Sequence, residues 1–300
     1  MMTLNKQKAY QIIGVIGVLA SIAAFVKSPS FPTPDKLLVF MTFVFMILKQ
    51  ALSMLRRFLP FVAVLLIYES FRGQVNKFNS HIDYLTAPHF DQKVFGKLPT
   101  IYLQDWLWRG HVMWYDFVFY FAYLLHFILP ITLALIIWKL REEQYWRVVN
   151  TYLVVAFGAF ITFFLLPAAP PWMASDLHYI PHIDRISSSV WAAMGLHNFP
   201  SVYNHISPNP VAAIPSLHSA WATLLVIFVF KNFGKRWAAV AAIYPFLIYV
   251  GTIYQGEHYA FDVITGILYA IAGYLLTPWL MRKYWKLHKA IKPKIKQLLI

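Results

Sequence analysis

The hydrophobic positions of this chain gather in long, nearly unbroken runs that are separated by shorter polar segments. A helix that crosses a bilayer needs about 20 consecutive, mostly apolar residues. Six runs meet this requirement and are predicted as spans: Tyr10–Val26, Met113–Trp138, Val148–Leu166, Ile214–Phe230, Trp237–Ile253 and Tyr259–Met281. The pattern therefore predicts an all-α, polytopic bundle of transmembrane helices.

The stretch that follows the first span is less regular. Leu37–Leu55 is a weaker apolar run, Arg56 and Arg57 interrupt it, and Phe58–Phe71 is apolar again. This stretch contains either two spans or one span and an interfacial helix, and the sequence leaves both interpretations open. The two arginines mark the predicted end of a group of N-terminal membrane helices, residues 1–57.

Two longer segments are too polar to cross a membrane. Residues 72–112 mix polar and aromatic side chains, and the composition of Leu98–Trp108 suits a helix that lies in the membrane interface. Residues 167–213 form a loop rich in Pro, His, Ser and Asn. Structureless loops of this length usually have a function, so we expect one here.

The composition supports a membrane protein and excludes a soluble domain. Hydrophobic residues make up 59% of the 300 positions and charged residues 13%, whereas about 25% of the residues of a soluble domain are charged. The formal charge of +14 indicates loops that contact anionic lipid, and we expect no nucleic-acid partner. The absence of Cys excludes disulfides and thiolate catalysis.

The cations fall mainly on one side of the last five spans. If these spans alternate in direction, residues 139–147, 231–236 and 282–300 share one face and carry thirteen Lys and Arg residues. The opposite face, with the 167–213 loop, carries one cation, Arg185. Because basic loops stay in the cytoplasm, we expect a cytoplasmic tail at 282–300 and an outward-facing 167–213 loop.

Three polar clusters stand at the outward ends of consecutive spans, at Pro167–Trp172, Pro215–Ser219 and Tyr254–Asp262. In the third, His258 and Asp262 are four residues apart, so they share one face of a helix and the carboxylate can hold the imidazole. In the second, Ser216 is a natural N-cap. The amides that follow a helix N-cap can bind an anion. Two histidines, a carboxylate and a helix N-terminus suit phosphoryl transfer or metal binding.

At these clusters the chain resembles the phosphatidic acid phosphatase type 2 superfamily. The residues Pro215-Ser216-Leu217-His218 and His258-x-x-x-Asp262 look like its second and third signature motifs. Together with Pro-Ala-Ala-Pro-Pro-Trp at 167–172, they look most like the inositol phosphorylceramide synthase branch of lipid phosphotransferases. The resemblance covers about residues 113–281.

The resemblance implies a six-helix core, to which this chain adds one or more N-terminal helices, with an active site at the membrane surface. It implies that His258 is the nucleophile that forms a phosphohistidine, that Asp262 orients it, and that His218 protonates the leaving oxygen. It implies no metal and no other cofactor. Residues 58–281 are then the catalytic membrane domain, which acts on a phospholipid or another lipid phosphate among the membrane lipids.

The sequence departs from the phosphatase pattern in its phosphate-binding cations. Phosphatases of the superfamily carry a Lys and an Arg-Pro in the first motif, but Ala159–Trp172 contains no cation. They also carry an Arg six residues before the third-motif His, and here that position is Thr252. These differences favour a transferase, and we infer that Arg185 supplies the missing cation. The candidate substrate-binding residues, taken from the three clusters and the long loop, are Arg185, Ser216, Pro171, Trp172 and Tyr254.

Simpler interpretations exist for several of these residues. A loop arginine such as Arg185 often pairs only with lipid or with a neighbour such as Asp184. The Pro171-Trp172 pair also suits a helix end with an interfacial tryptophan. A lone histidine on a span, such as His126, is more often a packed residue than a catalyst.

Four functions remain to be compared. The first is transfer of a phosphorylated headgroup from a phospholipid donor to a hydroxyl acceptor through His258, and the second is hydrolysis of a lipid phosphate by the same residues. The third is an intramembrane zinc hydrolase, because two His and an Asp can ligate zinc. The fourth is a transporter, which needs polar residues at mid-membrane, whereas here they gather at helix ends. Neither the donor and acceptor lipids nor the oligomeric state can be read from these patterns.

Overall fold

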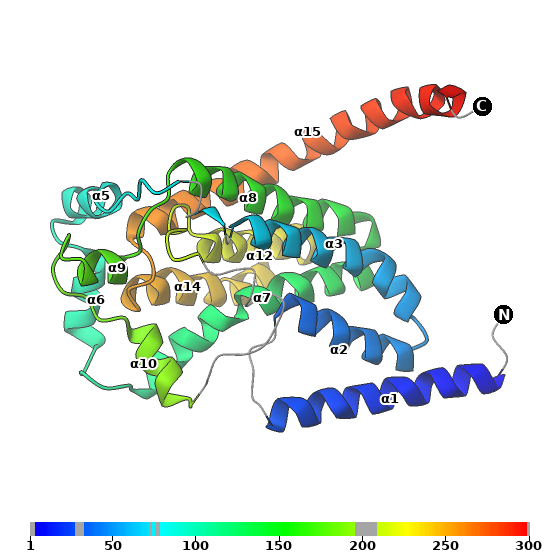
Figure 1. The fold of residues 1–300 in the computed structure, drawn as a ribbon, viewed down its shortest axis with the longest axis horizontal. Helices are drawn as coiled ribbons and strands as arrows, with labels where there is room; N and C mark the ends of the chain where they lie inside the picture. Colours follow the sequence, from blue (N-terminus) through cyan, green and yellow to red (C-terminus); the bar gives the residue numbers. More distant parts are fainter. Residues whose placement is uncertain (1–3, 28–32, 73, 76–78, 196–208, 299–300) are drawn as a thin grey trace.

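The computed structural model describes residues 4–27, 33–72, 74–75, 79–195 and 209–298. Within these ranges the regular secondary structure is helical, apart from two isolated bridges, and no strand is present. The long helices run side by side as a bundle, with shorter helices gathered at one end (Figure 1). The predicted all-α membrane architecture is confirmed.

Six helical segments of the described chain are long and apolar enough to cross a membrane: Gln7–Lys27, Ala51–Arg72, Trp114–Leu140, Glu142–Leu165, Lys235–Tyr254 and Ala260–Lys286. They belong to α1 (Leu4–Lys27), α3 (Ala51–Arg72), α7 (Trp114–Leu140), α8 (Tyr145–Leu165), the pair α13 (Lys235–Ala241) and α14 (Ile243–Tyr254), and α15 (Ala260–Leu298). One further apolar helix, α12 (Leu217–Phe233), has 17 residues, which is about 26 Å at ~1.5 Å per residue.

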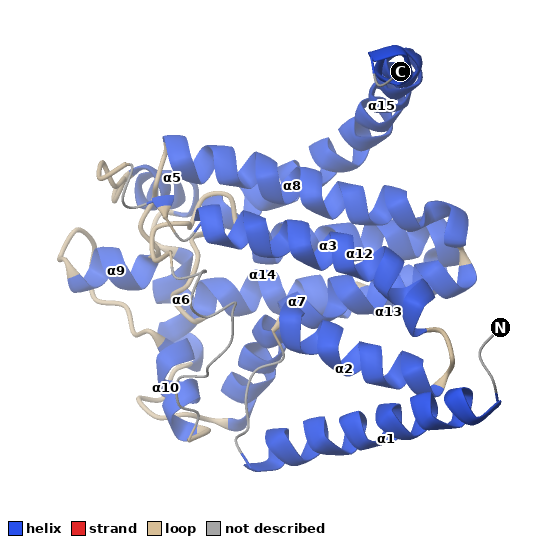
Figure 2. Cartoon of the chain, turned by 45° about the vertical axis from the view of Figure 1, so that its right-hand side comes forward, coloured by secondary structure: helices blue, strands red, loops and turns tan. Residues whose placement is uncertain are grey.

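Helix α12 lies at the centre of the bundle. It packs against α7, α8, α13, α14 and α15, and its side chains Trp221, Leu224 and Phe228 are buried. A helix that is covered on every side is apolar all round, which explains why α12 has no polar face. Helices α3, α7, α8, α12, α13–α14 and α15 form the expected six-helix core, and α1 packs mainly on α2 (Pro34–Ile47) beside it (Figure 2).

The N-terminal helices break at a different place from the one that the sequence predicts. The interruption was expected at Arg56 and Arg57, but α3 runs through both, and the chain turns instead near Lys49, whose φ is 58°. The side chain of Arg57 pairs with Glu142, and the Tyr145 hydroxyl donates to the Arg57 carbonyl at 3.0 Å, so α3 contacts the α7–α8 connection and the start of α8 at this point. Helix α3 therefore crosses the boundary expected at residue 57. The structure matches the interpretation with one span in this stretch. Helix α3 is long and apolar enough to cross a membrane, whereas α2 has only 14 residues.

The polar segments build the end of the bundle that carries the candidate site. Residues 72–112 hold α5 (Thr86–Phe95) and α6 (Pro99–Leu107), and the second of these confirms the helix expected at Leu98–Trp108. The long loop is not structureless, because it contains α9 (Pro171–Asp176) and α10 (Ile186–Ala193). Its residues 196–208 lie outside the described residues. All four short helices lie at one end of the bundle, and the α2–α3, α7–α8 and α12–α13 connections lie at the other (Figure 1).

The beginnings of α12 and α15 are joined by direct hydrogen bonds. The Ser216 amide donates to the Asp262 carbonyl at 3.0 Å, and the Ser219 hydroxyl donates to the Val263 carbonyl at 3.1 Å. This contact requires a glycine on α15, because a Cβ at Gly266 would lie 2.1 Å from the Ser219 Oγ and 2.3 Å from the Ser216 carbonyl oxygen. The absence of a side chain at residue 266 therefore sets the spacing of the two helices.

We expect Gly266→Ala to destabilise the protein, although alanine is normally the better helix former by ~1 kcal/mol. The added methyl group overpacks the α12–α15 contact, which costs ~1–3 kcal/mol. The matched control is Gly158→Ala in α8, where a Cβ would lie 3.7 Å from its nearest neighbour, Tyr269. Thermal unfolding in detergent should show a lower Tm for the first variant only, and equal Tm values for both would contradict the packing constraint.

Candidate active site

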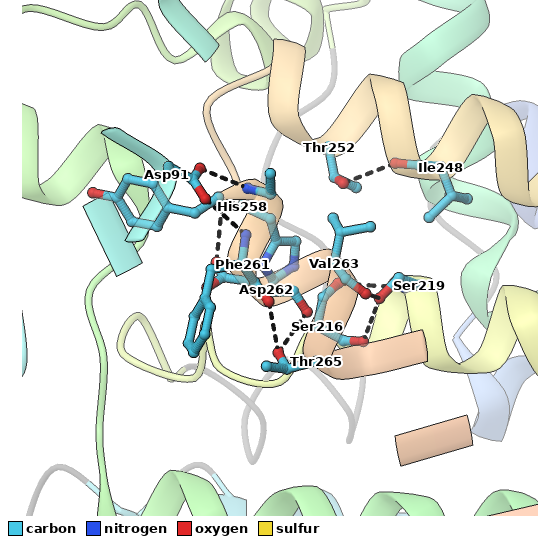
Figure 3. Close-up of polar contacts among 12 residues, drawn as sticks. Asp91, Ser216, Ser219, Ile248, Thr252, His258, Phe261, Asp262, Val263 and Thr265 are labelled. Atoms are coloured by element: carbon cyan, nitrogen blue, oxygen red, sulfur yellow. Dashed lines mark hydrogen bonds and ion pairs between the residues drawn. The ribbon is translucent and has the colours of Figure 1, made fainter. Parts of the chain in front are cut away.

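The structure brings the three candidate catalytic residues together at the end of the bundle. His218 lies in the first turn of α12, His258 lies in the turn before α15, and Asp262 lies in the first turn of α15. The Nδ1 atom of His258 lies 3.3 Å from Oδ2 of Asp262, and the ring centres of His218 and His258 are 5.6 Å apart. Figure 3 shows Asp262 directly beside the His258 ring. The predicted pair is therefore present, although it joins the first turn of α15 to the turn before it and does not lie within one helix.

The carboxylate of Asp262 fixes the orientation of the His258 ring. Its Oδ2 atom accepts from the Tyr259 amide at 2.9 Å, which holds the carboxylate in place. An imidazole whose Nδ1 faces a carboxylate keeps its proton on that nitrogen and presents an unprotonated Nε2. His258 lines the cavity described next, so this arrangement suits nucleophilic attack on a group bound there.

A cavity of about 330 Å³ opens beside the two histidines. Its walls come from the end of α3, one face of α7, the start of α9, the segment before α12 and the turn before α15. The lining residues are Glu69, Arg72, Tyr123, His126, Phe127, Phe163, Pro170, Trp172, Arg185, Asn209, Pro210, Ala212, Ala213, Leu217, His218, Glu257 and His258. Charged groups of both signs therefore face the two histidines.

Two of the five candidate substrate-binding residues, Trp172 and Arg185, line this cavity. The other three do not. Ser216 caps α12, because its hydroxyl accepts from the Ser219 amide at 3.3 Å. Pro171 is buried as the first residue of α9.

The third residue outside the cavity wall, Tyr254, is fully buried. Its hydroxyl donates to Oδ1 of Asp116 at 2.6 Å. The other carboxylate oxygen of Asp116 accepts from the Met113 amide at 2.7 Å and so caps α7. The contacts of Tyr254 thus join α14 to the start of α7 and are those of a packing residue.

Arg185 is held at the edge of the cavity by two neighbours. Its Nε donates to Oε1 of Glu257 at 2.9 Å, and its guanidinium carbon lies 4.1 Å from the centre of the Trp172 ring. Glu257 also accepts from the Ser187 hydroxyl. The ion-pair partner is therefore Glu257, next to His258 in the chain, and Asp184 instead lies 3.7 Å from His182. With its side chain 42% exposed, Arg185 can still bind a ligand.

Sequence reasoning missed a second arginine, Arg72, which lies at the end of α3 and lines the same cavity. Its Nε lies 2.7 Å from Oε2 of Glu69, one helical turn earlier. Two arginines, Arg72 and Arg185, therefore line the cavity, whereas only Arg185 was expected from the sequence. A signal was present, because Glu69 is a carboxylate inside an apolar run and Arg72 stands at the i+3 position beside it.

His126 is packed, as expected, but it also lines the cavity. Its ring stacks on Trp221 with 4.6 Å between ring centres and lies 4.2 Å from the ring of His218. Tyr123 also stacks on His218, with 4.2 Å between the ring centres. Tyr123 and His126 of α7 therefore restrict the rotation of the His218 ring.

Thr252, where the phosphatase pattern has an arginine, does not face the cavity. Its hydroxyl donates to the Ile248 carbonyl at 2.8 Å, and its own carbonyl accepts from the amides of Glu257 and His258 at 3.0 and 3.1 Å. Thr252 thus shapes the turn that carries His258 (Figure 3). The cations of this cavity come instead from α3 and from the long loop, through Arg72 and Arg185.

The start of α15 is capped by a residue from a distant segment, Asp91 of α5. Its two carboxylate oxygens accept from the amides of Ala260 and Phe261, each at 2.9 Å (Figure 3). Asp91 is fully buried. Burial raises the pKa of Asp91 to about 6, and the two N–H donors oppose that rise. The cap fixes the helix turn that carries Asp262.

Among the residues that the structure describes, no group of three or more His, Cys, Asp or Glu side chains is arranged to hold a metal ion. His218, His258 and Asp262 therefore do not form a three-ligand cluster.

The family model for the PAP2 superfamily, the phosphatidic acid phosphatase type 2 superfamily, matches residues 89–276. A phosphoinositol dihydroceramide synthase of Bacteroides thetaiotaomicron is 31% identical over 155 residues, 49% of this chain and 50% of the relative. An uncharacterised protein of Methanocaldococcus jannaschii is 32% identical over 127 residues, 42% of this chain and 50% of that protein. The chain thus matches about half the length of each of these relatives. No solved structure matches it.

We expect Asp91→Ala to loosen the start of α15, because it leaves the amides of Ala260 and Phe261 without their cap. Loss of an N-terminal cap costs about 1 kcal/mol, which is about fivefold in an opening equilibrium. Hydrogen exchange read by mass spectrometry should therefore quicken at residues 259–265. The control is Asp105→Ala in α6, which removes an exposed ion pair with Lys97 and should leave exchange at residues 259–265 unchanged. Unchanged exchange in Asp91→Ala would show that the cap is dispensable.

Proposed function

Because the chain belongs to the PAP2 superfamily, we propose that it is a lipid phosphotransferase that moves a phosphorylated headgroup from a phospholipid donor to a hydroxyl acceptor. Membership makes it a multi-pass membrane enzyme, either a phosphotransferase or a phosphatase. The observation that carries the proposal is the His258–Asp262 pair, 3.3 Å apart, at a cavity shared with His218. Transfer is favoured over hydrolysis by the similarity to a phosphoinositol dihydroceramide synthase.

The first step forms a phosphohistidine. Nε2 of His258 attacks the phosphorus of the donor, and the bond from phosphorus to the diacylglycerol oxygen breaks. His218 gives a proton to that departing oxygen. Asp262 keeps the other ring nitrogen protonated and stabilises the positive charge that develops on the ring.

The second step reverses the roles of the groups. His218, now unprotonated, takes the proton of an acceptor hydroxyl, and the hydroxyl oxygen attacks the phosphorus. The bond between phosphorus and Nε2 of His258 breaks, and the phosphorylated headgroup leaves on the acceptor. With water in place of the acceptor, the same residues catalyse hydrolysis, which is the alternative function.

Arg185 supports the binding of the phosphate in this scheme. A guanidinium forms charge-assisted, often bidentate, hydrogen bonds to phosphate oxygens. Arg185 lines the cavity and is positioned by Trp172 and Glu257. A phosphate near His258 can take over part of the contact that Glu257 makes with Arg185.

We also propose that the active site faces away from the cytoplasm. The basic connections and the site lie at opposite ends of the bundle (Figure 1). Basic loops stay on the cytoplasmic side, so the cavity opens on the extracytoplasmic side and the 282–300 tail lies in the cytoplasm. Donor and acceptor then both come from the outer leaflet.

The central test uses donor phospholipid with a radiolabelled headgroup phosphate. The wild type should carry acid-labile, base-stable phosphate, and His258→Ala should carry none and should not turn over. Asp262→Asn should form the phosphoenzyme at least about 10²-fold more slowly, the lower range of general acid–base effects. His218→Ala should be nearly inactive with lipid donors but should recover with a donor whose leaving group needs no proton.

Several controls separate this proposal from its alternatives. His111→Ala, an exposed histidine outside the cavity, should behave as the wild type. Mass spectrometry of the products distinguishes transfer to an added acceptor lipid from release of free phosphate. Turnover that is abolished by chelator and restored by zinc would support a zinc hydrolase. Label on His218, or turnover by His258→Ala, would overturn the assigned roles.

The orientation can be tested cleanly because the chain contains no Cys. Single cysteines are introduced at two exposed positions, as Asp176→Cys in α9 and Glu143→Cys in the α7–α8 connection. In sealed right-side-out vesicles, a membrane-impermeant maleimide should label the first directly and the second only after permeabilisation. The reverse result would contradict the proposed topology.

A further inference from the structure

A largely buried ion pair, between Arg72 and Glu69, lines the cavity at the end of α3. Arg72 is the last residue of the helix, and Glu69, one turn earlier, accepts from its Nε at 2.7 Å. Their side chains are 17% and 5% exposed. Removing two charges from water is costly, so an ion pair this buried is weak evidence of a purely stabilising role.

Both members of this pair face the histidines that carry the chemistry. Arg72 and Glu69 line the same cavity as His218 and His258. The Arg72 carbonyl also accepts from Nδ2 of Asn209 at 2.8 Å, which ties the end of α3 to the segment before α12. The end of α3 is thus tied to the segment that leads into α12, the helix that carries His218.

The N–H donors of the two arginines suit an anionic ligand that contacts both of them. Arg72 and Arg185 are each paired with a glutamate, Glu69 and Glu257, so the four charges cancel. A guanidinium has five N–H donors, which is more than one carboxylate oxygen requires. Each glutamate can therefore position its arginine while the arginine also binds phosphate oxygens.

We propose that Arg72, positioned by Glu69, is a second phosphate-binding residue, so that the phosphate of the substrate is held between Arg72 and Arg185 while His258 attacks it. This inference rests on the proposed function. The family model begins at residue 89, so the pair lies outside the part of the chain that the model matches. Helix α3 thereby belongs to the active site and is more than a membrane anchor.

Orthovanadate, a phosphate mimic, provides a test that needs no knowledge of the lipid substrates. Thermal unfolding of the purified protein in detergent is measured against vanadate concentration. Vanadate should raise the Tm of the wild type, and Arg72→Gln should need at least about tenfold more vanadate for half of the effect. Arg72→Lys should fall between the two, because lysine keeps the charge but lacks the planar fork.

The matched control is Arg57→Gln. Arg57 lies near the start of the same helix and pairs with a glutamate, Glu142, whereas Arg72 and the cavity lie at the end of that helix. Its vanadate response should stay within about twofold of the wild type, because a partly exposed ion pair contributes little. An equal loss in Arg57→Gln and Arg72→Gln would overturn the inference, since both would then act through the stability of α3.

A second variant and a second measurement guard against misfolding. Glu69→Gln combined with Arg72→Gln removes both charges and leaves no buried ion unpaired, and it should also lose the vanadate response. In the wild type, vanadate should slow the modification of Arg72 by phenylglyoxal, as read by mass spectrometry, but not that of the exposed Arg109.

The outcomes separate this inference from the proposed function. A wild type that does not respond to vanadate overturns both. A wild type that responds, with an unchanged response in Arg72→Gln and no protection of Arg72 from phenylglyoxal, overturns the role of Arg72 alone. Loss of response in the variants together with protection of Arg72 supports it.

Discussion

The contact between the beginnings of α12 and α15 is the constraint on which the rest of the site depends. The Ser216 amide and the Asp262 carbonyl are joined across the two helices, and Gly266 allows the close approach. His218 lies on one of these helices and His258 with Asp262 at the start of the other, so this contact sets the distance between the proposed acid and the proposed nucleophile. Geometry of this kind must be held to fractions of an ångström for efficient transfer. Backbone hydrogen bonds between membrane helices are well suited to provide that rigidity.

Electrostatic balance is the second organising feature. An arginine buried without a partner is strongly unfavourable, and each arginine of the cavity has a glutamate beside it. The pairing therefore makes both arginines tolerable within a membrane protein. In the proposed reaction, the same glutamates compete with a bound phosphate for the guanidinium groups, which weakens the hold on a phosphorylated product. A site that turns over needs both properties, since a cavity with unpaired cations would retain its anionic product.

The sequence predicted the parts of this molecule that depend on local periodicity. Hydrophobic runs located the spans, because helix geometry and bilayer thickness set their length. The four-residue spacing of His258 and Asp262 predicted their contact, although His258 lies in the turn before α15 and not on the helix. The i, i+3 spacing of Glu69 and Arg72 marks a polar pair inside an apolar run, but its position at the cavity depends on how α3 packs in the bundle, which no spacing along the chain encodes. The break near Lys49 was missed for a similar reason. Arg57, one of the two arginines expected to end a helix, instead contacts Glu142 and Tyr145 from a segment distant in sequence.

The two sides of the cavity are built from different kinds of structure. The side with His218 and His258 is formed by membrane helices whose backbones are joined to each other, whereas Trp172, Arg185 and residues 209–213 belong to the connecting loop. Loops accept substitutions and insertions far more readily than packed helices. Variation in the loop can thus alter which lipids fit the cavity while the residues on the helices stay the same. This architecture allows the substrate range to diversify during evolution, or to be changed in the laboratory by exchanging the loop.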